Sequence, residues 1–191
     1  MKTEVVIRND ILTVLIGDHI TDMDSSVLCI YDFDWNRYLS PWKHEKVFAK
    51  GEAFAGEADL FLEEVLGLIP EGDWKEIIIA GYSLAGLFAL YACTKSSVFT
   101  ACMCASGSLW FKGFTEYLKE NPVRCRRVYM SLGDREKDTK NPVMGKVEAN
   151  TLEAVHDMET YTSVYFEMNP GGHFSEPERR IRKGIRYLHL H

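Results

Sequence analysis

A chain of 191 residues, 46% of them hydrophobic and 26% charged, has the composition of one soluble globular domain spanning residues 1–191. Its formal net charge of −6 at pH 7 argues against a general nucleic-acid binder and against a protein that binds anionic membranes, because both need a basic surface.

Strands and helices alternate through most of the chain. The β-rich runs 3–8 and 11–17, separated by the turn residues Asn9 and Asp10, predict an opening antiparallel pair. Further strands are expected at 26–33, 76–81, 99–106, 126–133 and 161–169. Helices are expected at 56–69, 84–94, 114–120, 142–158 and 176–189. This alternation predicts a mostly parallel sheet with helices on both faces, in which ligands bind beyond the carboxyl ends of the strands.

The last predicted helix carries a run of basic residues. They alternate with Ile181, Ile185 and Leu188 at helical spacing, so we interpret the whole run as the solvated face of that helix. The run consists of Arg179, Arg180, Arg182, Lys183 and Arg186.

The cysteines and the N-terminal segment predict a cytoplasmic protein. The five cysteines are an odd number, with no C-x-x-C pair and no His/Cys spacing suited to zinc, so we expect buried free thiols and no metal site. Residues 1–17 are interrupted by Glu4, Arg8 and Asp10, unlike a secretory signal. No stretch approaches the ~20 apolar residues of a membrane span.

A serine, two acids and a histidine follow the predicted strands in turn. Ser83 comes after the fourth strand, Asp134 and Glu136 after the sixth, and His173 after the seventh. Because the carboxyl ends of parallel strands meet at one edge of a sheet, we expect these side chains to lie together. The order serine, acid, histidine is the order found in α/β-hydrolases.

Residues 81–86, GYSLAG, predict a sharp turn from strand to helix that exposes a nucleophilic serine. Gly81, Ala85 and Gly86 are small where strand and helix must pass closely. A non-glycine residue at such a turn costs about 1–3 kcal/mol, which favours a functional role for Ser83. The alternative is that Ser83 only caps the helix. The stretch lacks the G-x-G-x-x-G spacing of a dinucleotide site and the lysine of a P-loop.

An oxyanion hole is expected beside this serine. The Leu84 N–H should supply one donor, because the first N–H groups of a helix have no carbonyl partner within it. The second donor should come from the loop after the third predicted strand, where Trp35 and Asn36 are the candidates.

His173 is the candidate general base because it lies in a glycine-rich loop between the last strand and the last helix. The alternative is a histidine with a structural role only. The other histidines are poorer candidates, because they lie before the serine, inside a helix or at the terminus: His19, His44, His156, His189 and His191.

The acid that orients the imidazole is expected in the segment SLGDREKD, residues 131–138. We favour Glu136, with Asp134 second and Asp138 as a further candidate. The alternative for all three is a solvated surface acid.

Several blocks of sequence together resemble a known group of enzymes. In order they are GYSLAGLFALYA, ASGSLW, SLGDREKDTKNPVM and NPGGHF, preceded by DWNRYLSPW and GEAFAGEADLFLEEVL. Over residues 26–188 they resemble esterases of the α/β-hydrolase superfamily related to siderophore esterases and S-formylglutathione hydrolases.

The resemblance implies a three-layer α/β-hydrolase fold, minimal and without a lid, with Ser83 as nucleophile, His173 as base and Glu136 as the acid of a G-x-x-E pattern. It departs from the usual G-x-S-x-G-G at Ala85, whose methyl group is expected to shift the turn slightly.

The predicted function is hydrolysis of a small-molecule carboxylic ester through an acyl-enzyme, without a cofactor. The alternatives are an acyltransferase with the same triad and a non-catalytic binding domain on the same fold. Aromatic residues in the loops suggest an apolar group in the cleft, although they could equally be packing residues: Trp35, Trp42, Trp110 and Phe174.

Overall fold

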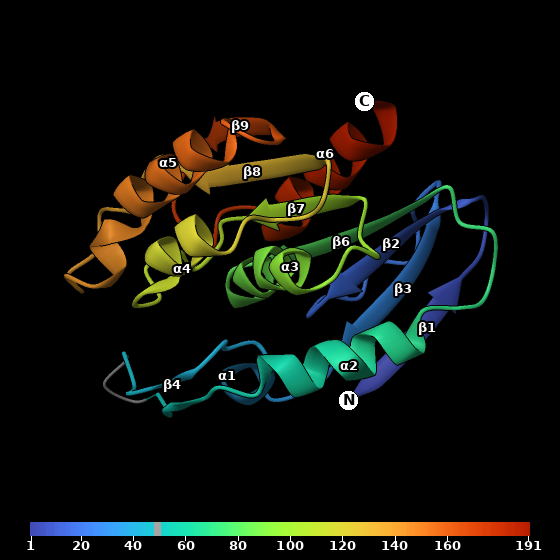
Figure 1. Ribbon diagram of the computed structural model, residues 1–191. Helices are drawn as coiled ribbons and strands as arrows, with labels where there is room; N and C mark the ends of the chain where they lie inside the picture. The colour runs from blue at the N-terminus through green and yellow to red at the C-terminus, as the bar shows by residue number, and fades with distance from the viewer. Residues whose placement is uncertain (48–50) are drawn as a thin grey trace.

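A seven-stranded sheet forms the centre of the computed structural model, which describes residues 1–47 and 51–191 (Figure 1). Its strands lie in the order β1-β3-β2-β6-β7-β8-β9, and all are parallel except β1. Their bounds are β1 Lys2–Val6, β2 Ile11–Ile16, β3 Ser26–Tyr31, β6 Glu76–Tyr82, β7 Ala101–Ala105, β8 Arg127–Gly133 and β9 Ser163–Asn169. The mostly parallel sheet expected from the alternating pattern is confirmed.

The expected antiparallel pair at the start of the chain is wrong. β1 pairs antiparallel with β3, and β2 runs parallel between β3 and β6. Burial explains the arrangement, because β2 is almost entirely buried and needs a neighbour on each side, whereas β1 is half exposed as an edge strand is. The Ser26 hydroxyl accepts hydrogen bonds from the N–H groups of Arg8 and Asn9, so the connection crosses the start of β3 instead of closing a hairpin.

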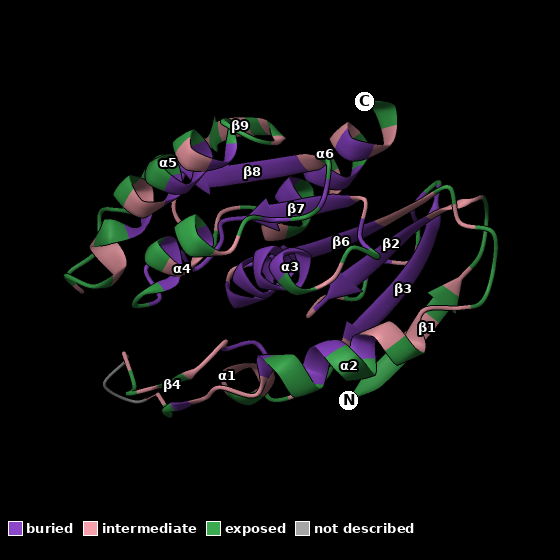
Figure 2. Ribbon diagram, viewed as in Figure 1, coloured by how far each residue is buried: buried purple, intermediate pink, exposed green. Residues whose placement is uncertain are grey.

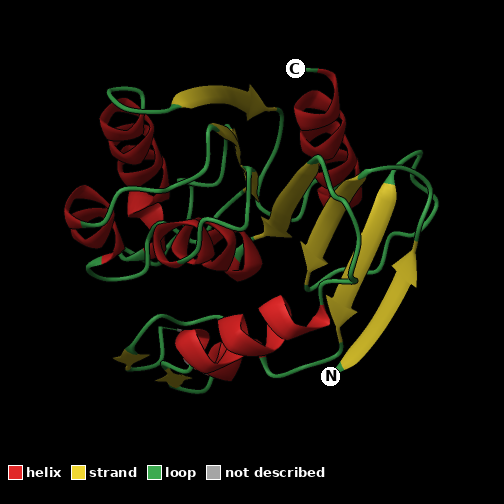
Figure 3. Cartoon of the chain, turned by 45° about the vertical axis from the view of Figure 1, so that its right-hand side comes forward, coloured by secondary structure: helices red, strands yellow, loops and turns green. Residues whose placement is uncertain are grey.

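Helices cover both faces of the sheet, as predicted. α2, α3, α4 and α5 share one hydrophobic cluster with one face, while α6 packs against the other (Figure 3). Their bounds are α1 Trp35–Tyr38, α2 Ala58–Leu68, α3 Leu84–Lys95, α4 Phe114–Glu120, α5 Val147–Met158 and α6 Pro177–Leu190. A short pair of strands, β4 Lys43–His44 and β5 Phe54–Ala55, lies beside α1, and a 3₁₀ turn at Met144–Lys146 precedes α5.

α3 is the central helix of the fold. It is buried from Leu84 to Thr94 and packs on β6 and β7 (Figure 2). A helix that is apolar all round can be stable only in such a position. The junction between β6 and α3 is therefore held on all sides by the core, and Ser83 lies at that junction.

The cysteines lie inside this core: all five are free and buried. Within residues 1–47 and 51–191, no helix is long and apolar enough to cross a membrane.

Candidate active site

Ser83 occupies a strained turn between β6 and α3. Its backbone has φ 58° and ψ −124°, a conformation that costs a non-glycine residue about 1–3 kcal/mol. Neighbouring strands and loops hold it there: its N–H donates to the Ala105 carbonyl at 3.0 Å, and its own carbonyl accepts from the N–H groups of Leu87 and Ser108. The surrounding core therefore supports the strain.

Small residues are required where β6 and α3 cross. A Cβ added to Gly81 would lie 2.3 Å from the Ala85 carbonyl oxygen, and one added to Gly86 would lie 3.0 Å from the Gly81 carbonyl oxygen. Ala85 is fully buried and presents its backbone to Gly81, so the tight contact at this crossing involves the backbone of Ala85. An alanine at position 85, in place of the usual glycine, is thus compatible with the turn.

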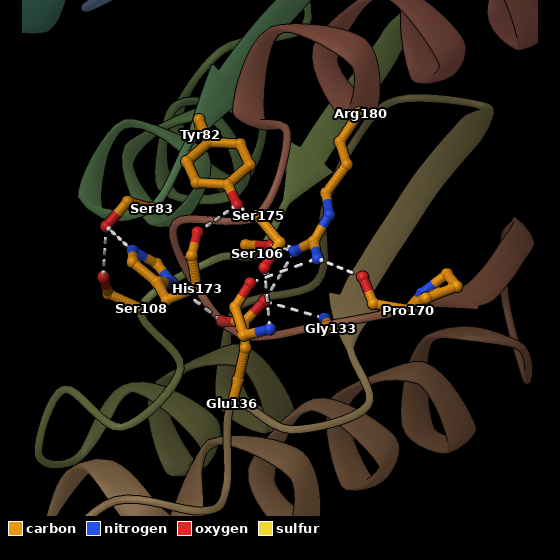
Figure 4. A network of polar contacts seen from close by, with 11 residues as sticks. Tyr82, Ser83, Ser106, Ser108, Gly133, Glu136, Pro170, His173, Ser175 and Arg180 are labelled. Carbon is orange, nitrogen blue, oxygen red and sulfur yellow. Dashed lines mark hydrogen bonds and ion pairs between the residues drawn. The ribbon is translucent and has the colours of Figure 1, made fainter.

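The Ser83 side chain does not cap α3. Its Oγ lies 3.0 Å from His173 Nε2 and 3.4 Å from Ser108 Oγ (Figure 4). The helix-cap alternative therefore does not describe this serine.

His173 lies in the loop between β9 and α6, with its side chain 22% exposed. Nδ1 lies 2.7 Å from Glu136 Oε2, on the opposite side of the ring from Ser83. The His173 carbonyl accepts a 2.6 Å hydrogen bond from the Tyr82 hydroxyl. Both the ring and the backbone of this histidine are thus held by named partners. Two other histidines make contacts elsewhere, His19 with Glu4 and His189 with Thr13.

Glu136 is the acid that the structure places against His173. Its side chain is only 2% exposed, whereas Asp134 and Asp138 are exposed residues. Asp134 accepts a hydrogen bond from the N–H of Gly171 instead, and so supports the loop that carries His173.

The second carboxylate oxygen of Glu136 is fully occupied. Oε1 accepts hydrogen bonds from Ser106 Oγ and the Gly133 N–H, each at 2.7 Å, and from Arg180 Nη1 at 3.0 Å. Burial alone would raise the pKa of Glu136, but hydrogen bonds from His173, Ser106 and Gly133 outweigh burial and hold that pKa below its ordinary value. The group is therefore ionised at neutral pH.

Arg180 corrects the interpretation of the basic run on the last helix. It is buried and reaches the site, whereas its neighbour Arg179 is exposed. Spacing contains a signal for this, because residues 180, 184 and 188 are four apart and all three lie on the buried face of α6. A charged residue at the same helical spacing as the buried residues was the signal that Arg180 differs from the rest of the run.

The oxyanion candidates lie at the starts of two helices. Leu84 is the first residue of α3, where N–H groups have no partner within the helix. Trp35 is the first residue of α1, and its ring covers Gly17, where an added Cβ would lie 2.5 Å from Trp35 Cζ2. The side-chain amide of Asn36 donates to the carbonyl of Glu52. In the sheet, β2 lies between β3, which precedes Trp35, and β6, which precedes Ser83.

The aromatic candidates other than Trp35 have different surroundings. Phe174 is 89% exposed and meets the His173 ring edge to face at 5.1 Å. Trp42 packs against Phe111 and donates its indole N–H to the Lys112 carbonyl. Trp110 is buried. Phe174 therefore has a ring contact with the histidine of the site.

No set of three or more His, Cys, Asp or Glu side chains is arranged to hold a metal ion in the described part of the chain.

No known protein family matches the sequence, and no curated protein matches it either. Siderophore hydrolase EstA from Aspergillus nidulans superposes with a TM-score of 0.68 at 17% identity, over 95% of this chain and 82% of that one. The enterobactin esterase FES from Shigella flexneri gives 0.61 at 19% identity, over 98% of this chain and 54% of that one.

Acyl-protein thioesterase 2 from Zea mays also gives a TM-score of 0.61, at 14% identity, over 97% of this chain and 98% of that one. Likeness at such low identity establishes the fold and leaves the activity to be argued from the site. The chain therefore has a small α/β-hydrolase fold, of the kind seen in these esterases.

Proposed function

We propose that the protein is a serine hydrolase that cleaves a carboxylic ester through an acyl-enzyme. One observation carries the proposal: an unbroken chain of contacts runs from Ser83 Oγ to His173 Nε2 at 3.0 Å, and from His173 Nδ1 to Glu136 Oε2 at 2.7 Å. Both distances lie within the range that proton transfer and imidazole orientation need. The likeness of the fold to esterases supports the same conclusion.

Each residue of the chain has one role in this reaction. Ser83 Oγ attacks the ester carbonyl while its proton passes to His173 Nε2, and the imidazolium then gives that proton to the departing alcohol. A water molecule next loses a proton to His173 and attacks the acyl-enzyme. As the bond between the acyl carbon and Ser83 Oγ breaks, the imidazolium returns the proton to Ser83 Oγ and the carboxylic acid leaves. Glu136 stays ionised throughout, accepting from Nδ1 and stabilising the imidazolium.

The oxyanion is assigned to backbone donors on two sides of Ser83. The Leu84 N–H is one, since it follows the nucleophile at the start of α3. β2 neighbours β6 with Ile16 opposite Gly81, so the loop that begins at Gly17 continues alongside Ser83. We therefore assign the second donor to the N–H group of Asp18, in place of Trp35, because the Gly17 N–H donates to the Ile30 carbonyl at 2.8 Å.

The exposed ring of Phe174 beside His173 supports a substrate with an apolar group. Phe174 offers an almost fully exposed ring next to the general base, and an apolar part of a small-molecule ester would bury that ring on binding. Trp42 and Trp110 are assigned to packing because of their contacts and burial.

Covalent labelling with a fluorophosphonate tests the proposal. The wild-type protein should be labelled at Ser83, and Ser83→Ala should abolish labelling and lower nitrophenyl ester hydrolysis by roughly 10⁴–10⁶-fold. Ser108→Ala is the matched control, because Ser108 Oγ is a second hydroxyl 3.4 Å from Ser83 Oγ. Labelling that persists in Ser83→Ala, or is absent from folded wild-type protein, would contradict the assignment.

A further inference from the structure

Arg180 and Glu136 form a buried ion pair behind the proposed triad. The side chains of Arg180 and Glu136 are 3% and 2% exposed. Among residues 1–47 and 51–191 they are the two charged residues that are buried. Removing two charges from water is costly, and their attraction compensates only when further hydrogen bonds satisfy both groups. Such a pair needs an explanation beyond stability.

The guanidinium connects two loops that carry different members of the triad. Nη1 donates to Glu136 Oε1 at 3.0 Å and to Ser106 Oγ at 2.9 Å. Nη2 donates to the carbonyls of Pro170 and Gly172, at 3.2 and 3.1 Å, in the loop that ends at His173 (Figure 4). One planar group thus contacts the Glu136 carboxylate and the backbone of the loop that carries His173.

On this basis, which rests on the proposed function, we propose that Arg180 is a positioning residue for the reaction: it fixes the distance and angle between the Glu136 carboxylate and the His173 imidazole. The planar fork of an arginine suits this role, because it donates in two directions at once from a rigid group. A lysine ammonium at the end of a flexible chain would keep the charge and lose this bridging geometry.

The surrounding backbone is built closely around the guanidinium. A Cβ added to Gly133 would lie 2.9 Å from Arg180 Nη2 and 2.4 Å from the Gly171 carbonyl oxygen. Gly171 has φ 100°, so the loop before His173 takes a turn that favours glycine. Gly133, the last residue of β8, and Gly171, two residues before the histidine, therefore both accommodate the bridge between the two loops.

The inference has a direct consequence for catalysis. Without the bridge, the loop before His173 loses the donor to two of its carbonyls, and Glu136 loses the charge that neutralises it. A displacement of about 1 Å in catalytic geometry can cost about 10²-fold in rate. We therefore expect kcat to fall by about 10–10²-fold in Arg180→Met with KM nearly unchanged, because Arg180 lies behind the triad and away from the substrate.

The experiment compares Arg180→Met and Arg180→Lys with the control Arg179→Met. Arg179 is the adjacent residue, is exposed and pairs with Glu176 at the surface, so its variant should keep wild-type kcat. Proton NMR of the imidazole N–H that faces Glu136 gives a readout independent of hydrolysis. We expect a downfield signal in the wild type and in Arg179→Met, its loss in Arg180→Met, and intermediate values of the signal and of kcat in Arg180→Lys.

The outcomes separate the two proposals. Full kcat and an unchanged imidazole signal in Arg180→Met would overturn the positioning role, and so would a fall in kcat with the signal unchanged. If Arg180→Met does not fold, Arg180→Lys decides, and wild-type kcat and signal in that variant would overturn the role. A wild-type protein that shows the imidazole signal but neither hydrolyses esters nor takes the label contradicts the proposed function, while the NMR comparison still decides the role of Arg180.

Discussion

The hydroxyl of Tyr82 donates a 2.6 Å hydrogen bond to the backbone carbonyl of His173. The residue before the proposed nucleophile therefore holds the backbone of the proposed base. Their rings also lie 5.4 Å apart. The geometry of β6 is thus transmitted to a loop that follows β9, three strands away in the sheet.

Tyr82→Phe tests this relationship. The substitution keeps the ring and removes the hydroxyl, which donates to the His173 carbonyl and also accepts from Arg180 Nη1 at 3.3 Å. The hydrogen bond to His173 is worth about 1 kcal/mol, which corresponds to about a fivefold change if its loss is felt in the transition state. We expect kcat to fall by about this factor and the midpoint of urea unfolding to fall. The control is Tyr117→Phe, which loses a 2.8 Å contact with Thr94 on the other face of the sheet and should lower stability without lowering kcat.

Glu136→Gln tests which acid orients the imidazole. An amide in place of the carboxylate cannot stabilise the imidazolium, and comparable changes elsewhere lower kcat by roughly 10⁴-fold. Asp134→Asn should retain most of the activity, because an amide oxygen can still accept from the Gly171 N–H. Steady-state kinetics on a nitrophenyl ester decides between them. A large loss in Asp134→Asn with a small one in Glu136→Gln would reverse the assignment.

Most of the site could be located from the sequence because its parts follow rules of local structure. Ser83 lies in a short motif with a steric logic, and His173 lies in the loop after the last strand, where parallel sheets bind ligands. The sequence favoured Glu136 over Asp134, but rules of local structure do not separate them, since both follow β8. It depends on a turn in which the Glu136 N–H donates to the Gly133 carbonyl, and side-chain direction in a turn is set by tertiary contacts.

Other features were missed because local patterns do not report long-range partners. Asn9 and Asp10 mark a turn correctly, but the burial of β2 on both sides decides which strands it pairs with. Arg180 was hidden in a basic run whose other members are exposed or only partly buried. The sequence left open whether Trp42 and Trp110 line the site or pack in the interior, and their contacts and burial support the packing role proposed above.

Gly81→Ala tests the close approach of β6 and α3. The new methyl group would collide with the backbone of Ala85 and Gly86, and backbone cannot rotate away as a flexible side chain can. Overpacking of this kind costs about 1–3 kcal/mol. We expect that loss in urea denaturation together with reduced kcat. Gly67→Ala is the matched control: it lies in α2 with nothing within 4 Å of the new Cβ, so it should gain roughly 0.5–1 kcal/mol from helix propensity.

Asp18→Asn tests the electrostatics of the loop that adjoins Ser83. Burial, with a smaller contribution from the charge of Glu178, raises the pKa of Asp18 from 3.8 to about 6. The folded state therefore binds this proton more tightly than the unfolded state, so the stability that the neutral carboxyl provides is complete below about pH 4 and is lost as pH rises to about 6. Asp18→Asn cannot ionise and should be more stable than the wild type above pH 6, by on the order of 1–3 kcal/mol, and similar to it at pH 4.

Asp24 is an exposed acid before β3, so Asp24→Asn should leave the pH dependence unchanged. Thermal unfolding of the three proteins between pH 4 and pH 8 makes the comparison, and a gain in Asp18→Asn that is equal at all pH values would show that ionisation of Asp18 is not its cause.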